Sequence, residues 1–394
     1  MTIRGVIIRN GDVYAPQHLG HADVTVVGGQ VFSLQPDAWR ELAGVKGFEF
    51  EQIDAAGGMV FPGLVDIHCH FGGAGGEGGP VYRTPPLQLS DLTTAGITTA
   101  IGLLGTDGCG RSLRELLLKA RALDEEGVST WIYTGSYQLP GPTLTGDVTS
   151  DLLLIDKVLG LKVAFSDHRA SQSSVERLRE YAAQSRVGGI LAGKSGIVMV
   201  HIGEGEDRLE PLLRAARTSD IPLTQFVPTH LNRSRRVLEQ AVRYVKSGGR
   251  VDVTSGVSER CFFPGAVKPS RAVVELLNAG VPIEHVTMSS DGNGVMTHID
   301  ERTGETQPLM APVASLFVEF CDMIREGLPP ETASRVTSAN SADALRLGHG
   351  KGRLVVGGDA DVIVLTPGLE LKAVIARGKT LVNDGAVVKG LFER

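Results

Sequence analysis

The sequence is poor in cysteine and in long apolar runs. Its 4 cysteines, without a CxxC pair, argue against a disulfide framework or a cysteine-only zinc site. We therefore expect four reduced, buried thiols, at Cys69, Cys109, Cys261 and Cys321. No stretch is apolar enough to span a bilayer, and the first residues lack the apolar core of a signal peptide. These absences favour a soluble, cytoplasmic protein.

The sequence also lacks an excess of positive charge. Its 39 basic residues are outnumbered by 45 acidic ones, for a formal net charge of -6. This balance argues against a nucleic-acid surface and against binding to anionic membranes. A small-molecule substrate is favoured instead.

The length of 394 residues allows one large α/β domain with an appendage, or two to three ordinary domains.

Short apolar, β-branched runs recur through the middle of the chain, each followed by a stretch with helical periodicity. Their spacing of roughly 25 to 35 residues is typical of strand, crossover helix and return strand in a parallel sheet. Eight such units predict an α/β fold with a (β/α)8, TIM-like barrel over residues 58–349. The predicted strands are Gly63–His68, Thr98–Leu104, Thr130–Tyr133, Leu161–Phe165, Ile197–His201, Leu223–Val227, Val251–Thr254 and Val286–Ser290. Apolar residues spaced by three and four predict helices over Ser112–Glu126, Arg208–Ser219, Arg233–Ser247 and Ser270–Ala279.

The two ends of the chain have a different pattern. Residues 1–57 and 350–394 contain short alternating β runs separated by glycine pairs such as Gly28-Gly29 and Gly357-Gly358. Neither end is long enough for a robust sheet alone. We expect them to pair into one small β-sandwich domain beside the barrel.

Polar groups recur where the predicted barrel strands end, which is where barrel enzymes carry their chemistry. His68 and His70 form a His-x-His at the end of the first strand, and residues two apart in a strand face the same side. Imidazole is the commonest metal ligand of proteins and suits zinc. The later strands add Lys162, His201, His230 and Asp291.

Each of these residues has an ordinary alternative when taken singly. A lone histidine after a strand is more often a hydrogen-bonded structural residue, Lys162 could snorkel or form an ion pair, and Asp291 could cap a turn. Six independent coincidences at successive strand ends are much less probable than one site. The joint placement therefore predicts a metal centre.

Lys162 fits such a centre if its amine is modified. A free ammonium would repel two divalent cations, whereas a neutral lysine can add carbon dioxide and become a carbamate that bridges two ions. His68, His70 and Asp291 would then hold one ion, and His201 and His230 the other. Metal coordination lowers the pKa of water from 15.7 toward about 7, which yields hydroxide at neutral pH.

These residues resemble the amidohydrolase superfamily, in the subtype with two zinc ions bridged by a carboxylated lysine, over essentially the whole chain. Within it, the sequence is similar to the isoaspartyl (β-aspartyl) dipeptidase family. The distinguishing segments are the glycine-rich loop from His70 to Pro80, Gly135-Ser136-Tyr137, Asp167-His168-Arg169, His230-Leu231-Asn232-Arg233 and Ser289 to Gly294.

The resemblance implies hydrolysis of the isopeptide bond of β-aspartyl dipeptides by a hydroxide that bridges the two zinc ions. Such a substrate carries one ammonium and two carboxylates, for which Glu77, Arg169 and Arg233 are suitable partners. Tyr137 resembles the family tyrosine that donates to the oxyanion, and Thr106 is expected to touch the substrate. Asp291 would take the proton from the hydroxide and pass it to the leaving amine. A homo-oligomer, for example an octamer, is also implied.

The sequence departs from that family at one position. Members tend to carry a serine four residues after the catalytic aspartate, and Val295 stands there instead. Either another donor replaces the hydroxyl, or the preferred substrate differs from a plain β-aspartyl dipeptide. Two alternatives remain open: hydrolysis of a cyclic amide, as in dihydroorotases and hydantoinases, and a non-catalytic scaffold, which the retained metal-ligand set disfavours.

Overall fold

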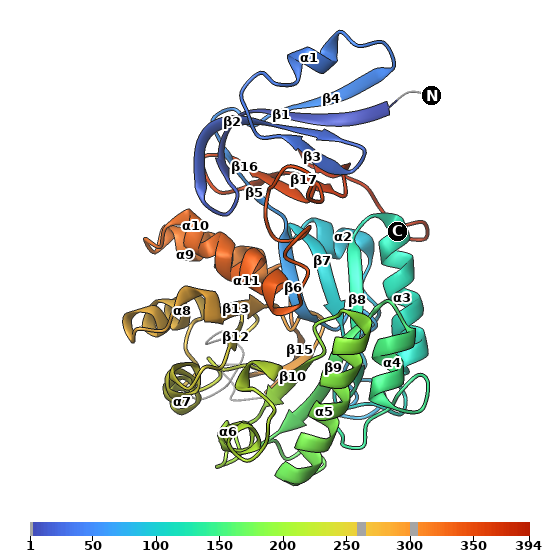
Figure 1. Cartoon of the computed structure of the whole chain (residues 1–394), viewed down its shortest axis with the longest axis vertical. Helices are drawn as coiled ribbons and strands as arrows, with labels where there is room; N and C mark the ends of the chain where they lie inside the picture. The colour runs from blue at the N-terminus through green and yellow to red at the C-terminus, as the bar shows by residue number, and fades with distance from the viewer. Residues whose placement is uncertain (1–2, 258–264, 300–305) are drawn as a thin grey trace.

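The computed structural model describes residues 3–257, 265–299 and 306–394, and it places a sheet built from both chain ends beside a barrel (Figure 1). Cys261, one of the four expected buried thiols, lies outside the described residues. No helix within the described ranges has the length and apolar character needed to cross a membrane.

The barrel consists of parallel strands in chain order, which confirms a TIM-barrel fold. Strands β6 to β11 form one parallel sheet, β12 pairs with β13, and β11 contacts β12. The ring closes where β13 meets β6, through the Asp291 amide that donates to the His68 carbonyl at 3.0 Å. The strands are β6 (Leu64–Cys69), β7 (Ile97–Gly102), β8 (Ser129–Gly135), β9 (Val158–Phe165), β10 (Ile197–Ile202), β11 (Phe226–Thr229), β12 (Val251–Thr254) and β13 (Val286–Ser289).

These strands match the eight apolar runs of the sequence closely. Their side chains are buried almost without exception, because helices cover one side of the barrel wall and the barrel interior lies on the other. Two starts differ by three residues. β9 begins earlier than predicted, at Val158 instead of Leu161. Residues Leu223–Gln225 form a short 3₁₀ turn (η1), and β11 begins only at Phe226. Pro222 lacks an amide hydrogen for a strand ladder, and its carbonyl accepts the Gln225 amide at 2.9 Å, which closes a turn.

Helices surround the barrel wall (Figure 1). Three of the longer ones begin at a serine whose hydroxyl accepts an amide hydrogen of the first turn: Ser112, Ser174 and Ser234. The main apolar core lies between strands and helices, for example where Ala120 and Leu123 pack with Ile132. The helices are α2 (Leu89–Thr93), α3 (Leu113–Glu126), α4 (Val148–Leu154), α5 (Val175–Ala192), α6 (Glu210–Arg217), α7 (Arg235–Lys246), α8 (Pro269–Asn278), η2 (Ile283–His285), α9 (Ser315–Arg325), α10 (Pro330–Ser334), η3 (Arg335–Ala339) and α11 (Asn340–Ala344).

The two ends of the chain join one sheet, with a short helix α1 (Arg40–Ala43) between its strands. β5 connects them, since it pairs with β1 from the N-terminal part and with β16 from the C-terminal part. A separate apolar core, which includes Val24, Val60 and Val364, combines residues of both ends. The strands are β1 (Ile3–Tyr14), β2 (His18–Val27), β3 (Gln30–Ser33), β4 (Phe48–Asp54), β5 (Met59–Pro62), β16 (Val362–Leu365), β17 (Leu371–Ala376), β18 (Lys379–Asn383) and β19 (Ala386–Val387).

Two further features differ from the sequence reading. An antiparallel hairpin, β14 (Val295–Ile299) with β15 (Thr306–Met310), follows the last barrel strand and was not expected. The expectation of buried thiols holds for Cys69 and Cys321 but is wrong for Cys109, which is exposed. Cys109 lies in the loop between β7 and α3, where its amide donates to Asp107 and its side chain meets solvent.

Candidate active site

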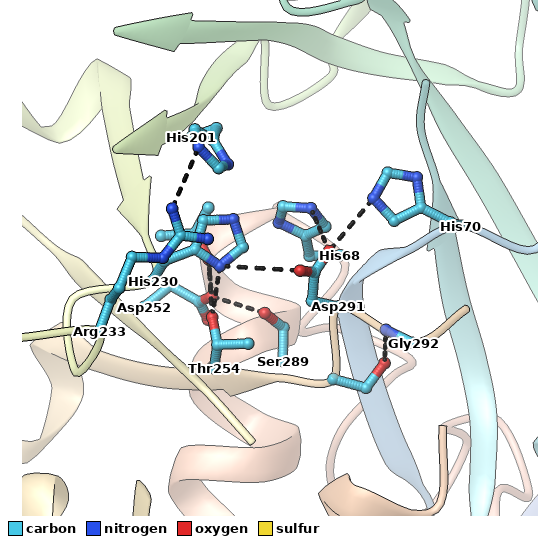
Figure 2. Close-up of polar contacts among 12 residues, drawn as sticks. His68, His70, His201, His230, Arg233, Asp252, Thr254, Ser289, Asp291 and Gly292 are labelled. Carbon is cyan, nitrogen blue, oxygen red and sulfur yellow. Dashed lines mark hydrogen bonds and ion pairs between the residues drawn. The ribbon is translucent and has the colours of Figure 1, made fainter. Parts of the chain in front are cut away.

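The candidate metal ligands lie at the carboxyl ends of the barrel strands. His68 ends β6 with His70 just beyond it, His201 lies in β10, His230 follows β11, and Asp291 follows β13. Figure 2 shows His68 and His70 directed toward Asp291 from one side and His230 from the other. The structure thus brings together side chains that are far apart along the chain.

The tightest group consists of His68, His70 and Asp291. The Nε2 atoms of His68 and His70 lie 3.2 and 3.1 Å from Oδ1 of Asp291. One ligand atom from each of the three residues falls within 4.8 Å of the others. The Nδ1 atoms of His68 and His70 are buried and make no hydrogen bond within the described residues. A cluster of two imidazoles and a carboxylate is a donor set that suits a divalent metal ion.

Hydrogen bonds between Asp66 and the neighbouring Ser290 fix the segment that carries Asp291. Asp66, two residues before His68 in β6, accepts the Ser290 amide at 3.0 Å and also binds the Ser290 hydroxyl. Asp291 and His230 both adopt left-handed backbone conformations, with φ of 51° and 67°. Such conformations cost on the order of 1 kcal/mol in residues other than glycine, and they cluster at functional sites.

His201 and His230 lie beside this group. Their ring centroids are 4.6 Å apart, and the His230 ring is 5.1 Å from that of His68. Nδ1 of His230 lies 2.8 Å from the Thr254 hydroxyl and 4.0 Å from Oδ2 of Asp291. His201 contacts the Tyr137 hydroxyl through Nδ1 at 2.6 Å.

Burial keeps the imidazoles of His68, His201 and His230 neutral. It lowers the pKa of His68 to about 3 and the pKa values of His201 and His230 well below their usual range. Burial alone would raise the pKa of Asp291, but His230 and His68 hold it well below its usual value. Neutral imidazoles and an ionised carboxylate are the protonation states that metal binding requires.

Lys162 is completely buried in β9, and its Nζ lies 3.3 Å from Nε2 of His68. Burial lowers the pKa of this amine to about 7, although Asp291 and Asp252 act in the opposite direction. No carboxylate of the described chain lies within ion-pair distance of Nζ. At neutral pH a large share of Lys162 is therefore an uncharged, nucleophilic amine.

A cavity of about 300 Å³ opens above these residues. Its wall combines His70 and Asp291 with Glu77, Thr106, Tyr137, Arg169, Arg233, Val295 and Met296. Arg169 lies 3.5 Å from Glu77 across this space, and Nη1 of Arg233 lies 3.4 Å from Nε2 of His201. The residues expected to bind substrate therefore line the same cavity as two of the candidate metal ligands.

Two residues that carry hydroxyl groups line this cavity, Tyr137 and Thr106. Burial raises the pKa of the Tyr137 phenol above its usual value, so the hydroxyl keeps its proton and can act as a donor. The Thr106 hydroxyl is buried without a hydrogen-bond partner in the described part of the chain.

Sequence reasoning missed the carboxylates that support these residues. Asp167 accepts hydrogen bonds from Arg169 and lies 2.7 Å from Nε2 of His201, and Asp66 supports the Asp291 loop. Asp66 could have been found, because it shares a strand face with His68. Asp167 lies beside His168 and Arg169, two residues after β9. Its contact with His201 was not predictable, because the two residues are far apart in the sequence.

A comparison with family models matches residues 59–381 to the amidohydrolase family. Among solved structures, the chain resembles the β-aspartyl dipeptidase of Fervidobacterium islandicum AW-1, a structure in complex with the β-Asp-Leu dipeptide. The TM-score is 0.88 and the identity 36%, with 100% of both chains covered. The L-hydantoinase (dihydropyrimidinase) of Arthrobacter aurescens has a TM-score of 0.67 at 17% identity and covers 98% of both chains, a likeness of fold alone.

A curated relative that acts on a cyclic amide matches less of the chain. A dihydroorotase of Lactobacillus johnsonii is 26% identical over 273 residues, which cover 64% of this chain. The chain spans 59% of the length of that dihydroorotase.

Proposed function

The chain belongs to the amidohydrolase family, and from this premise we propose that it is a metal-dependent dipeptidase that cleaves the isopeptide bond of β-aspartyl dipeptides. The observation that carries this proposal is one cavity lined by His70 and Asp291 of the metal-ligand set together with Glu77, Arg169 and Arg233. The full-length resemblance to a β-aspartyl dipeptidase supports it.

We infer that His68, His70 and Asp291 hold one zinc ion and that His201 and His230 hold a second. The fit rests on the buried Nδ1 atoms of His68 and His70, which have no partner in the described part of the chain, and on the compact group that both histidines form with Asp291. It also rests on the neutral imidazoles of His68, His201 and His230. When bound, the ions would polarise the scissile carbonyl and lower the pKa of the attacking water.

Lys162 is proposed to bridge the two ions as a carbamate. The neutral amine attacks carbon dioxide, an N–C bond forms, and the amine loses one proton to solvent. The product is an anion with two oxygens, next to His68. The proposal rests on the burial of Lys162 and on the lack of an ion-pair partner for it in the described chain, since lysine is rarely buried without one.

Asp291 is proposed to carry the proton through the reaction. Its carboxylate takes a proton as water attacks the isopeptide carbonyl, and it returns that proton to the nitrogen of the leaving amine when the C–N bond breaks. Tyr137 is proposed to donate its hydroxyl hydrogen to the oxyanion that forms between these steps. The products are aspartate and a free amino acid.

The charges of the cavity match those of the proposed substrate. A β-aspartyl dipeptide has one α-ammonium group, for which Glu77 is the proposed partner, and two carboxylates, for Arg169 and Arg233. Thr106 is proposed as a further donor to the substrate, through a hydroxyl that has no hydrogen-bond partner among the described residues. Val295 and Met296 give one part of the wall an apolar surface.

We also infer that the sheet formed by both chain ends is a small β-sandwich domain that flanks the catalytic barrel. The support is its separate apolar core, to which the N-terminal strand β2 and the C-terminal strand β16 both contribute.

Hydrolysis of a cyclic amide is the second candidate, because a dihydroorotase and a hydantoinase are among the relatives. A panel of β-Asp-Leu, α-Asp-Leu, dihydroorotate and hydantoin separates the two, with zinc and bicarbonate supplied to the purified protein. We expect hydrolysis of β-Asp-Leu well above the other three. A preference for either ring substrate would overturn the dipeptidase assignment.

A further inference from the structure

Asp167 lies where the metal site and the substrate cavity meet. It follows β9 by two residues, and its side chain is only 4% exposed. One carboxylate oxygen accepts the Arg169 amide at 2.8 Å and Nε at 2.9 Å, and the other accepts Nη2 at 2.8 Å. The second oxygen also lies 2.7 Å from Nε2 of His201.

The contact with Asp167 determines which nitrogen of His201 carries the proton. A carboxylate can only accept, so its short contact with Nε2, at 2.7 Å, favours a proton on that nitrogen. Guanidinium nitrogens of Arg233 and Arg169 lie farther away, at 3.4 and 3.5 Å. Nδ1 then keeps its lone pair, which accepts the Tyr137 hydroxyl at 2.6 Å and which a metal ion would take in place of that hydrogen bond. Asp167 thereby leaves Nδ1 of His201 as the nitrogen available to a metal.

The same carboxylate determines how Arg169 faces the cavity. The edge of the guanidinium formed by Nε and Nη2 is occupied by Asp167 in a two-point contact, which restricts rotation of the group. Nη1 is left on the other edge, 3.5 Å from Glu77. The Arg169 guanidinium also lies 5.4 Å from the centre of the Tyr137 ring.

We propose that Asp167 is a positioning residue that sets the tautomer of His201 for metal binding and, through the same carboxylate, the orientation of Arg169 for substrate. Carboxylates that hold the outer nitrogen of a ligating histidine fix its tautomer and raise its basicity. The claim about the orientation of Arg169 rests on the proposed function, because it concerns substrate binding. The claim about the tautomer of His201 (the His201 half of the proposal) can be measured without any substrate.

The test compares the parent enzyme with Asp167→Asn. The amide has the size of the carboxylate but a single acceptor oxygen, so it cannot serve both His201 and the two Arg169 nitrogens. Asp343→Asn is the control, because Asp343 also binds an arginine at two points, through Nη1 and Nη2 of Arg353 at 2.8 and 2.9 Å. Within the described residues Asp343 has no histidine partner. Asp167→Glu keeps the charge and serves as the second variant if Asp167→Asn fails to fold.

Two readouts do not depend on catalysis. In metal-free protein, ¹⁵N NMR of the imidazoles should show His201 protonated at Nε2 in the parent and in Asp343→Asn, and a mixture of tautomers in Asp167→Asn. Zinc affinity, measured by competition with a chelator, should fall about 10- to 100-fold for one of the two ions in Asp167→Asn. Asp167→Glu should fall between the parent and Asp167→Asn in both readouts.

The third readout is the KM for β-Asp-Leu at saturating zinc, which should rise in Asp167→Asn and stay at the parent value in Asp343→Asn. If the parent does not hydrolyse β-Asp-Leu, the proposed function fails while the tautomer and zinc readouts still decide the His201 half. The proposal would be overturned if Asp167→Asn had the same His201 tautomer, the same zinc affinity and the same KM as the parent enzyme.

Discussion

Replacing Lys162 by methionine should stabilise the metal-free protein while it abolishes activity in the presence of zinc and bicarbonate. Methionine is close to lysine in length but has no charge, so it fills the same space in β9. Burial lowers the pKa of Lys162 from 10.5 to about 7. The folded chain therefore binds fewer protons at this site than the unfolded chain over that range of pH.

The size of the effect follows from linkage. With these two pKa values, Lys162 costs the folded state about 4 kcal/mol at pH 7 and about 2 kcal/mol at pH 9. Because folding lowers the pKa of Lys162, the amine destabilises the folded state most at low pH. This cost in folding free energy is complete below pH 7, decreases as the pH rises and vanishes above the pKa of the unfolded chain. Lys162→Met removes it, less a repacking cost of about 1 kcal/mol.

The assay is denaturant unfolding of the parent and the variant, both free of metal and carbon dioxide, at pH 7 and pH 9. We expect the variant to be more stable at both values, with the larger gain at pH 7. The matched control is Lys351→Met, because Lys351 is also buried but pairs with Asp361 at 2.7 Å and Asp359 at 2.9 Å. That change leaves Asp361 buried without its partner and should destabilise the protein by roughly 3–5 kcal/mol.

A loss of stability in Lys162→Met that resembles the loss in Lys351→Met would refute the reasoning, since it would mean that Lys162 has a compensating charge. An unchanged stability at both pH values would refute it as well. Activity is measured separately. Full hydrolysis of β-Asp-Leu by Lys162→Met would exclude the carbamate bridge, whereas partial rescue of Lys162→Ala by short carboxylic acids would support it.

Four further outcomes are expected. Asp291→Asn should lower kcat for β-Asp-Leu by about 10²–10⁴-fold when it is assayed at equal metal content, because it removes the proton carrier; a parent kcat would exclude that role. Glu77→Gln should raise KM for β-Asp-Leu far more than for its N-acetyl derivative, and an equal rise for both would place Glu77 elsewhere. Val295→Ser adds a hydroxyl to the cavity wall and should lower KM for β-Asp-Leu with little change in kcat, an effect that a raised KM would contradict. Removal of metal by a chelator should lower the thermal midpoint of the parent, and zinc should restore it, because a ligand that binds only the folded state stabilises it; a midpoint indifferent to zinc would argue against a metal centre.

The order of the barrel strands was predictable because each carries a buried apolar run. The features of the fold that were not predicted include the late start of β11, the hairpin after the last barrel strand and the exposure of Cys109. Pro222 and the turn after it delay the start of β11, and the hairpin of β14 and β15 shows no apolar run like those of the barrel strands. The exposure of Cys109 follows from the path of its loop, which composition does not reveal.

The sequence by itself determined which chemical groups the site could contain. The two-residue period of a strand places His68 and His70 on one face, and the parallel order of strands places His201, His230 and Asp291 at the same end of the barrel. Their roles as ligands, and those of Glu77 and Arg169 toward substrate, stay predictions.

The tertiary structure alone decided how these groups are paired and charged. Burial, which depends on the whole packed barrel, keeps the imidazoles of His68, His201 and His230 neutral and lowers the pKa of Lys162. Asp167 meets His201 across 34 residues of chain, and Ser290 meets Asp66 across 224. A hydrogen bond needs its two atoms within about 3 Å, and a contact between separate strands reaches that distance only once the chain has folded.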